Sequence, residues 1–266
     1  MVTVVVALGG SLLRPEVEER HDWLLELVSI VRDRIGVGDH LGLVVGGGAP
    51  AREGIELASP IIDDVDHLDM IGIAATRLNA TIIREALADE GIPVSGSIPQ
   101  GVSEAVEALL SSKVVVMGGT VPGHTTDAVA IRLAIQSGAG KCVIATNVAK
   151  VHEQDPKEHP EAKAFDSLTL EQLQSIVGPA EHAQAGGSQV VDPIGVREAV
   201  RHGLPLDILD GREPQNIRLA LEGGDFGGTV VAGGSVESQG HHPQGGTKDS
   251  SGSTCSSLTQ EGHPCS

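Results

Sequence analysis

The sequence predicts an α/β fold in which helices cover both faces of a mostly parallel sheet. One construction carries this prediction: an aliphatic run, then glycines, then a helical segment, repeated at residues 2–34, 41–57 and 114–134. The aliphatic runs are continuous rather than alternating, which is typical of parallel strands buried on both faces. With 266 residues, the chain is long enough to bury a substantial core.

Each element of the first half follows from apolar spacing and glycine breaks. Strands are expected at residues 2–8, 41–45 and 114–117, each ending on glycines. Helices are expected at 22–34, from 51 onward and at 66–90, where apolar residues recur near the helical period.

The second half continues the alternation. Helices are expected from about residue 127, at 169–177 with Thr169 as N-cap, and after Asp192-Pro193. Further strands are expected at 141–145, 206–209 and 228–231. From residue 233 the chain loses almost all its aliphatic residues, so 233–266 is expected to be a disordered polar tail.

The charge balance excludes some functions. The chain has 36 acidic and 18 basic residues, a net charge of −18, and such a surface repels nucleic acid phosphates. No apolar run approaches the roughly 20 residues that span a bilayer, and the start lacks a signal-peptide pattern. The three cysteines have no metal or disulfide spacing. A cytoplasmic protein without nucleic-acid or membrane partners is expected.

The glycine loops indicate the chemistry. They follow parallel strands, so they cluster at one sheet edge, where ligands of such folds bind. Glycines allow backbone N–H groups to approach an oxyanion, although an ordinary turn would look the same. The P-loop and Rossmann patterns are absent, as are a catalytic triad and a cysteine nucleophile. Phosphoryl transfer without a covalent intermediate fits best, because it needs mainly positioning and charge neutralisation.

The expected long helix at 66–90 has two faces. One is an apolar stripe, and the other carries Asp69, Gly72, Thr76 and Asn79 at helical spacing. The second face is either solvated or lines a ligand cleft.

Six segments together resemble archaeal-type uridylate (UMP) kinases, members of the amino acid kinase fold family. They are Gly9-Gly10-Ser11, VVGGGAPAR at 44–52, DMIGIAATRLNA at 69–80, MGGTVPGHTTDAVA at 117–130, ATNV at 145–148 and DPK at 155–157. The resemblance spans about residues 2–231, and MGGTVPGHTTDAVA at 117–130 is its most specific part. It implies a three-layer αβα sandwich, transfer of the γ-phosphoryl of ATP to UMP with Mg²⁺, and a homohexamer.

The resemblance also implies which part of the chain binds each substrate. Residues 1–112 form the UMP side, and residues 113–232 form the ATP side of the same sheet. The ATP contacts implied are Gly10, Ser11, Gly48, Arg52, Thr146, Asn147, His152 and Asp155. The UMP contacts implied are Gly47, Asp69, Thr120, Val121, Pro122, Gly123, His124, Thr125 and Thr126. No protein ligand to a metal is implied, and Mg²⁺ is expected to be held by phosphates and water.

Three charged residues have plainer alternatives. Asp69 is either a ribose ligand or a carboxylate favoured near a helix start. Arg52 is either a phosphate ligand and catalytic group or an exposed helix arginine. Asp127 is either a helix cap or the catalytic organiser of the glycine loops. The first lysine is Lys113, so Arg52, His124, backbone amides and Mg²⁺ must neutralise the transferring phosphoryl group.

The sequence departs from the family after ATNV. The usual continuation is Asp-Gly-Val-Tyr, whereas this chain has Ala149-Lys150-Val151-His152. His152 can still stack or hydrogen-bond, and Lys150 could reach a phosphate. Two alternatives therefore stay open: another small-molecule kinase of the same fold, acting on a carbamate, an amino acid or an isoprenoid phosphate, or a regulatory nucleotide-binding protein that has lost turnover.

Overall fold

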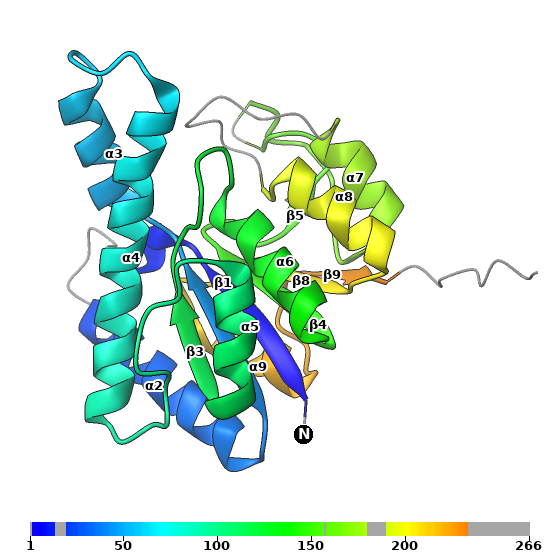
Figure 1. Cartoon of the computed structure of the whole chain (residues 1–266). Coiled ribbons are helices and arrows are strands. Elements are labelled where there is room, and N and C mark those ends of the chain that lie inside the picture. Colours follow the sequence, from blue (N-terminus) through cyan, green and yellow to red (C-terminus); the bar gives the residue numbers. More distant parts are fainter. Residues whose placement is uncertain (1, 14–19, 157, 180–189, 234–266) are drawn as a thin grey trace, which may run out of the picture. The chain divides into compact units, whose positions relative to one another are not determined.

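A seven-stranded sheet forms the centre of the computed structural model, which describes residues 2–13, 20–156, 158–179 and 190–233 (Figure 1). The pairs from β3 to β8 are parallel, β9 runs antiparallel to β8, and β7 is parallel to β9. In spatial order the strands are β3 (Val114–Met117), β2 (His40–Val45), β1 (Thr3–Leu8), β4 (Lys141–Thr146), β8 (Leu206–Asp210), β9 (Thr229–Ala232) and β7 (Ser167–Thr169). The expected mostly parallel sheet is confirmed.

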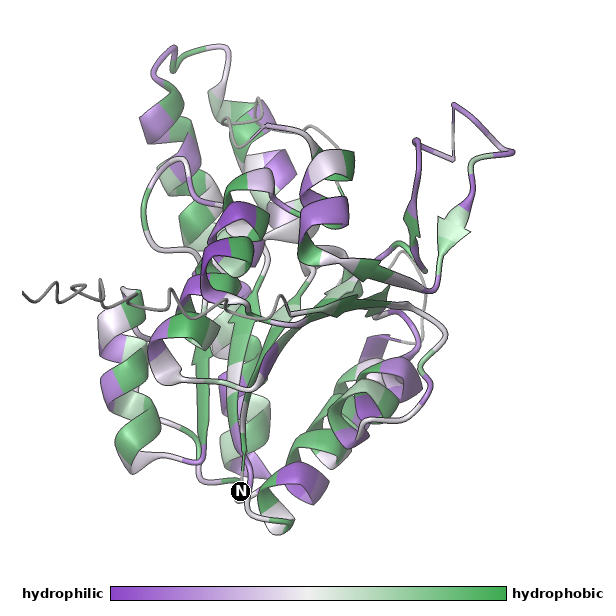
Figure 2. Ribbon diagram, turned by 90° about the vertical axis from the view of Figure 1, so that its right-hand side faces the viewer, coloured by the Kyte–Doolittle hydropathy of each residue, from purple (hydrophilic) through white to green (hydrophobic). Residues whose placement is uncertain are grey.

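Helices cover both faces of this sheet. In β1, Val4, Val6 and Leu8 face one core, and Val5 and Ala7 face the other. The first core is completed by α2 (Arg20–Gly36), α4 (Val65–Asp89) and α9 (Pro214–Glu222). The second is completed by α5 (Val102–Ser111), α6 (Thr126–Ser137), α7 (Leu170–Val177) and α8 (Pro193–His202). This burial on both sides explains why the strand sequences are continuously apolar (Figure 2).

The remaining elements are small or peripheral. The short helix α1 (Gly10–Leu13) follows β1, and α3 (Gly48–Ala58) packs on α4 without a buried residue of its own. A two-stranded sheet pairs β5 (Val151–His152) with β6 (Ala164–Phe165). None of the described helices is both long and apolar enough to cross a membrane.

The six expected strands and all six expected helices are present, with ends shifted by no more than three residues. Thr169 caps α7 as expected, accepting a hydrogen bond from the Gln172 backbone. The sequence reading did not identify α1, α5, α9 or the short strands β5, β6 and β7. Residues 234–266 of the expected tail, and Lys157 of the Asp-Pro-Lys segment, lie outside the described residues.

Five parallel strands end at the same sheet edge. Beyond their carboxyl ends lie Gly9, Gly46, Gly118, Asn147 and Gly211, in that order along the chain. This edge therefore brings together all three glycine loops and the ATNV segment.

Candidate active site

The first two glycine loops are in direct backbone contact. A methyl group on Gly10 would overlap the backbone nitrogen of Gly48, and one on Gly48 would overlap the Gly10 carbonyl. Gly48 also has φ of +60°, a conformation that other residues rarely adopt. Glycine is thus required on both sides of this contact, which holds loops 9–11 and 46–48 together.

Asn79 on α4 anchors the second loop. Its side chain is fully buried, and its Nδ2 donates to the carbonyls of Gly46 and Gly47 at 2.8 and 3.0 Å. In a planar trans peptide the N–H points opposite to the carbonyl. The N–H groups of Gly47 and Gly48 are therefore turned away from α4, which leaves them available for an anion.

Thr76, one helical turn earlier, anchors the third loop. Its Oγ1 accepts a hydrogen bond from the Gly119 backbone at 2.6 Å and donates to the Ile73 carbonyl at 2.6 Å. Gly118 packs so closely on this hydroxyl that a side chain there would overlap it. The face of α4 that carries Thr76 and Asn79 is therefore buried against loops and is not a solvated face.

The structure brings Asp69 together with the loop at 120–126. The Gly123 backbone donates to Oδ2 of Asp69 at 2.7 Å. Asp69 lies in the second turn of α4, whereas Asp64 and Asp66 occupy the N-cap and the first turn. A role as the helix-start carboxylate therefore belongs to those two residues, and Asp69 instead faces the loop.

The far side of this loop is held by α6 and α8. The Thr125 hydroxyl accepts from the Ala128 backbone as N-cap of α6 and donates to Oδ2 of Asp192 at 2.8 Å. Asp192 is itself the N-cap of α8, accepting from the backbones of Ile194 and Gly195. The loop is thus held between two helix N-termini.

Asp127 lies half-buried in the first turn of α6, beside Asp192. Burial, and secondly the negative charge of Asp192, raise its pKa from 3.8 to about 7. A carboxyl that titrates near neutrality next to glycine loops is typical of a functional site. It can exchange a proton or respond to a nearby cation at physiological pH.

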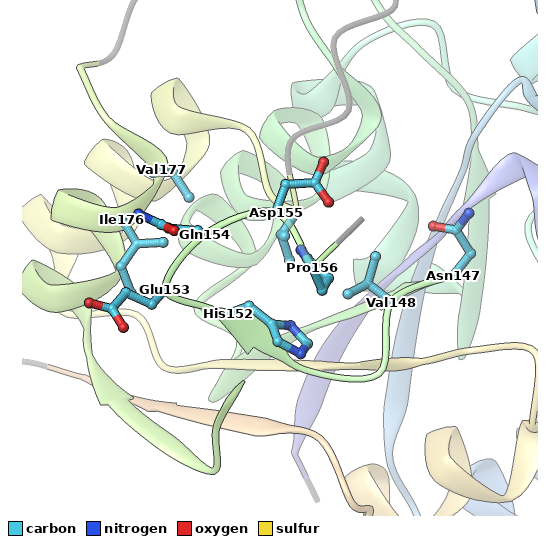
Figure 3. Close-up of a pocket in the computed structure, with 10 residues that line it drawn as sticks. Asn147, Val148, His152, Glu153, Gln154, Asp155, Pro156, Ile176 and Val177 are labelled. Atoms are coloured by element: carbon cyan, nitrogen blue, oxygen red, sulfur yellow. The ribbon is translucent and has the colours of Figure 1, made fainter. Parts of the chain in front are cut away.

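A cavity of about 240 Å³ lies beyond the end of β4 (Figure 3). Asn147, His152 and Asp155 line it, together with the apolar side chains of Val148 and Ile176. The Gly9 backbone donates to the Ala145 carbonyl at 2.9 Å, which joins the first glycine loop to the strand before this cavity. Three of the four residues expected there therefore share one cavity, and Thr146 ends the strand that leads to it.

Lys150 does not line that cavity. Its Nζ is paired with the Asp166 carboxylate, and both residues line a second cavity with Phe226 and the neighbouring glycines. The idea that Lys150 reaches a donor phosphate is not supported by this arrangement. Arg52, one turn into α3 after Gly48, has an exposed side chain.

Sequence reasoning missed several residues that support the site. Arg77 contacts the Thr120 carbonyl, and Arg132 joins His124 to Glu198. Each of these contacts spans more than one element, so no local spacing could have shown it. The position of Asp192 at a helix start could be predicted, because Asp before Pro is typical of that position. Its contact with Thr125 could not be predicted from the sequence.

Comparison with known proteins identifies the family of this chain. A model of the amino acid kinase family matches residues 2–210. Uridylate kinases from Methanospirillum hungatei and Methanocorpusculum labreanum are 38% and 37% identical to the chain, each aligning with 87% of it and with 95% and 96% of their own length. The crystal structure of uridylate kinase from Archaeoglobus fulgidus superimposes with a TM-score of 0.74 and 36% identity, covering 87% of this chain and all of that one. The chain therefore belongs to the amino acid kinase family, in the group that contains the archaeal uridylate kinases.

Proposed function

We propose that this protein is a UMP kinase, which transfers the γ-phosphoryl group of ATP to UMP and produces ADP and UDP. The observation that carries the proposal is the anchoring of the second glycine loop, and of the loop at 118–125, by one helix, α4, at the carboxyl edge of the sheet. The uridylate kinase relatives, which align over nearly their whole length, support the choice of acceptor.

The acceptor is assigned to the side formed by Asp69, Gly47 and residues 120–126. A carboxylate accepts from both hydroxyls of a ribose, and the loop offers threonine hydroxyls, backbone N–H groups and His124 to a phosphate. This assignment explains why Asp69 and a loop 54 residues away in sequence are held in contact.

The donor is assigned to Gly10, Ser11, Gly48 and Arg52 for its phosphates. The cavity lined by Asn147, His152 and Asp155, next to Thr146, is assigned to its nucleoside. His152 faces this cavity, so an aromatic ring is retained there despite the departure at 149–152. Under these assignments both halves of the chain contribute to both substrates: Asp69 and the loop at 120–126 face the acceptor, and the glycine loops of the first half and the cavity of the second half face the donor.

Catalysis by this chain rests on positioning and charge. Holding two nucleotides in line contributes on the order of 7–11 kcal/mol to lowering the barrier. Arg52, His124 and the loop amides stabilise the charge of the transferring group, and Asp127 organises the loops between them.

The described residues include no group of three His, Cys, Asp or Glu side chains that could hold a metal. We propose that Mg²⁺ enters with ATP, bound by phosphates and water, and offsets phosphate charge. Both nucleotides are intracellular metabolites, so the cytoplasm stays the expected compartment.

We also propose that the protein assembles as a homohexamer, as its family resemblance implies. An apolar stripe on α4 supports self-association, since Met70, Leu78 and Ile82 are 48, 50 and 38% exposed at intervals of one or two turns. Contiguous exposed apolar residues of this kind mark protein interfaces.

The acceptor is tested by measuring ADP release with UMP, CMP and AMP in the presence of Mg²⁺ and ATP. We expect release with UMP alone. Release with an amino acid, a carbamate or an isoprenoid phosphate instead would identify another kinase of this fold. Tight binding of UMP or ATP without release would identify a regulatory protein.

Substitution of Arg52 tests the source of positive charge. Arg52→Ala is expected to lower kcat/KM by about a hundredfold or more, because a charge that stabilises the transition state is lost. Arg197→Ala, which removes an exposed arginine from α8, is the matched control and should leave kcat/KM unchanged. A loss of less than about threefold for Arg52→Ala would remove this residue from the site.

The raised pKa of Asp127 predicts a pH-dependent cost to stability. The folded state favours the protonated carboxyl, because ionised Asp127 would be partly buried beside Asp192. The stability that the protonated form contributes is complete below the ordinary pKa of 3.8 and is lost as the pH rises through about 7. Asp127→Asn, which stays neutral, should be inactive yet more stable than the wild type at pH 8, by on the order of 1 kcal/mol or more. Measured by urea unfolding, the difference in free energy of unfolding between Asp127→Asn and the wild type should vanish near pH 4. Asp66→Asn, at an exposed position, is the control, and an equal gain there would contradict this account.

The assembly is tested by sedimentation of Leu78→Glu. A charge in the centre of the stripe should release smaller species from a wild-type hexamer, because burying an unpaired carboxylate is costly. Leu25→Glu, on a 62% exposed leucine of α2, should sediment like the wild type. A wild-type protein that sediments as a monomer at micromolar concentration would refute the hexamer.

A further inference from the structure

We propose that Arg132 and Glu198 are positioning residues that orient His124 toward the acceptor nucleotide. The proposal rests on the assignment of residues 120–126 to the acceptor. It adds two residues, from α6 and α8, that lie outside that loop and have no place in the proposed reaction.

The three side chains form a continuous chain of contacts. Nε of Arg132 lies 2.9 and 3.0 Å from the two carboxylate oxygens of Glu198, and Nη2 lies 2.8 Å from one of them. Nη1 lies 2.7 Å from Nδ1 and 3.0 Å from Nε2 of His124. One guanidinium thus contacts a carboxylate with one side and an imidazole with the other.

This arrangement requires arginine. A guanidinium presents several N–H donors in a fixed plane, so binding one side to Glu198 fixes the direction of Nη1. A guanidinium has no acceptor, so a ring nitrogen that it binds must present its lone pair. Because Nη1 lies close to both ring nitrogens, Arg132 constrains the place of the His124 ring, and the tautomer decides which nitrogen accepts.

Glu198 gives this arrangement its rigidity. The side chains of Arg132 and Glu198 are only 21 and 23% exposed, so the pair is largely shielded from water. Neutralised by Glu198, the Arg132 guanidinium acts through geometry rather than as a second phosphate-binding charge. Without Glu198, it would be able to turn away from His124.

A second contact, next to the one through Arg132, also joins α8 to the loop at 120–126. Thr125, next to His124, donates to Asp192 at the start of α8. A Cβ on Gly195 would lie 3.1 Å from the Ala128 backbone, so the two helices meet closely at this point. Asp192 and Glu198, six residues apart along α8, therefore contact Thr125 directly and His124 through Arg132. The position of α8 thus affects two consecutive residues of the loop.

The test is a double-mutant cycle of Arg132→Lys and His124→Ala, with steady-state KM measured separately for UMP and ATP. Arg132→Lys keeps the charge but loses the planar fork. It is expected to raise the KM for UMP about tenfold, within the range of couplings measured for residues in one network, and to change the KM for ATP less than about twofold. In the His124→Ala background, Arg132→Lys should have no further effect on the KM for UMP. Glu198→Gln should show a smaller rise of the same kind, and Arg197→Lys, on the exposed face of α8, should match the wild type.

A purely structural role gives a different pattern. If Arg132 only joined α6 to α8, its substitution would lower the unfolding midpoint and would affect both KM values, with or without His124. That result, or an unchanged KM for UMP in Arg132→Lys or in His124→Ala, would overturn the inference while the wild type still phosphorylates UMP. A wild-type protein that neither binds nor phosphorylates UMP would instead overturn the proposed function, and this inference with it.

Discussion

The hydrogen bonds from α4 to the glycine loops are the constraint on which the rest of the site depends. Asn79 holds the carbonyls of the second loop, and Thr76 holds the backbone of the third, although these loops lie about 70 residues apart in sequence. The two side chains are three positions apart on one helix, so they share a face. A 25-residue helix packed into the core gives this face a fixed position. The backbone of both loops is therefore held in one arrangement by a single helix face.

Charge in this site comes from few sources. The segment after β1 carries no lysine, Lys150 is committed to Asp166, and Arg132 is committed to Glu198 and His124. Arg52 remains exposed next to the second glycine loop. Asp127 has a pKa of about 7 because it is partly buried and Asp192 is near.

The sequence predicted those features that depend on local patterns. Continuous aliphatic runs ending in glycine located β1, β2 and β3, and the order of strands and helices predicted the parallel sheet. The shared position of the loops followed from topology alone. Short elements such as β5, with only two residues, have no periodicity to detect.

Contacts between distant elements could not be predicted in this way. Glu198 is 66 residues from Arg132, and neither residue differs locally from an ordinary helix-surface charge. The buried state of Asn79 was equally ambiguous, because a polar residue at helical spacing can face water or a loop. The placement of Lys150 depended on where Asp166 lies across a separate hairpin, which spacing does not encode.

The hydrogen bond between Asp69 and the Gly123 backbone has a consequence for selectivity. One oxygen of this carboxylate has an internal partner, so a sugar must compete with the Gly123 N–H or use the other oxygen. A 2′-deoxy sugar offers one hydroxyl fewer and compensates less of the dehydration of the carboxylate. Under the proposed assignment, the contact that joins Asp69 to this loop also favours ribonucleotides over their deoxy counterparts.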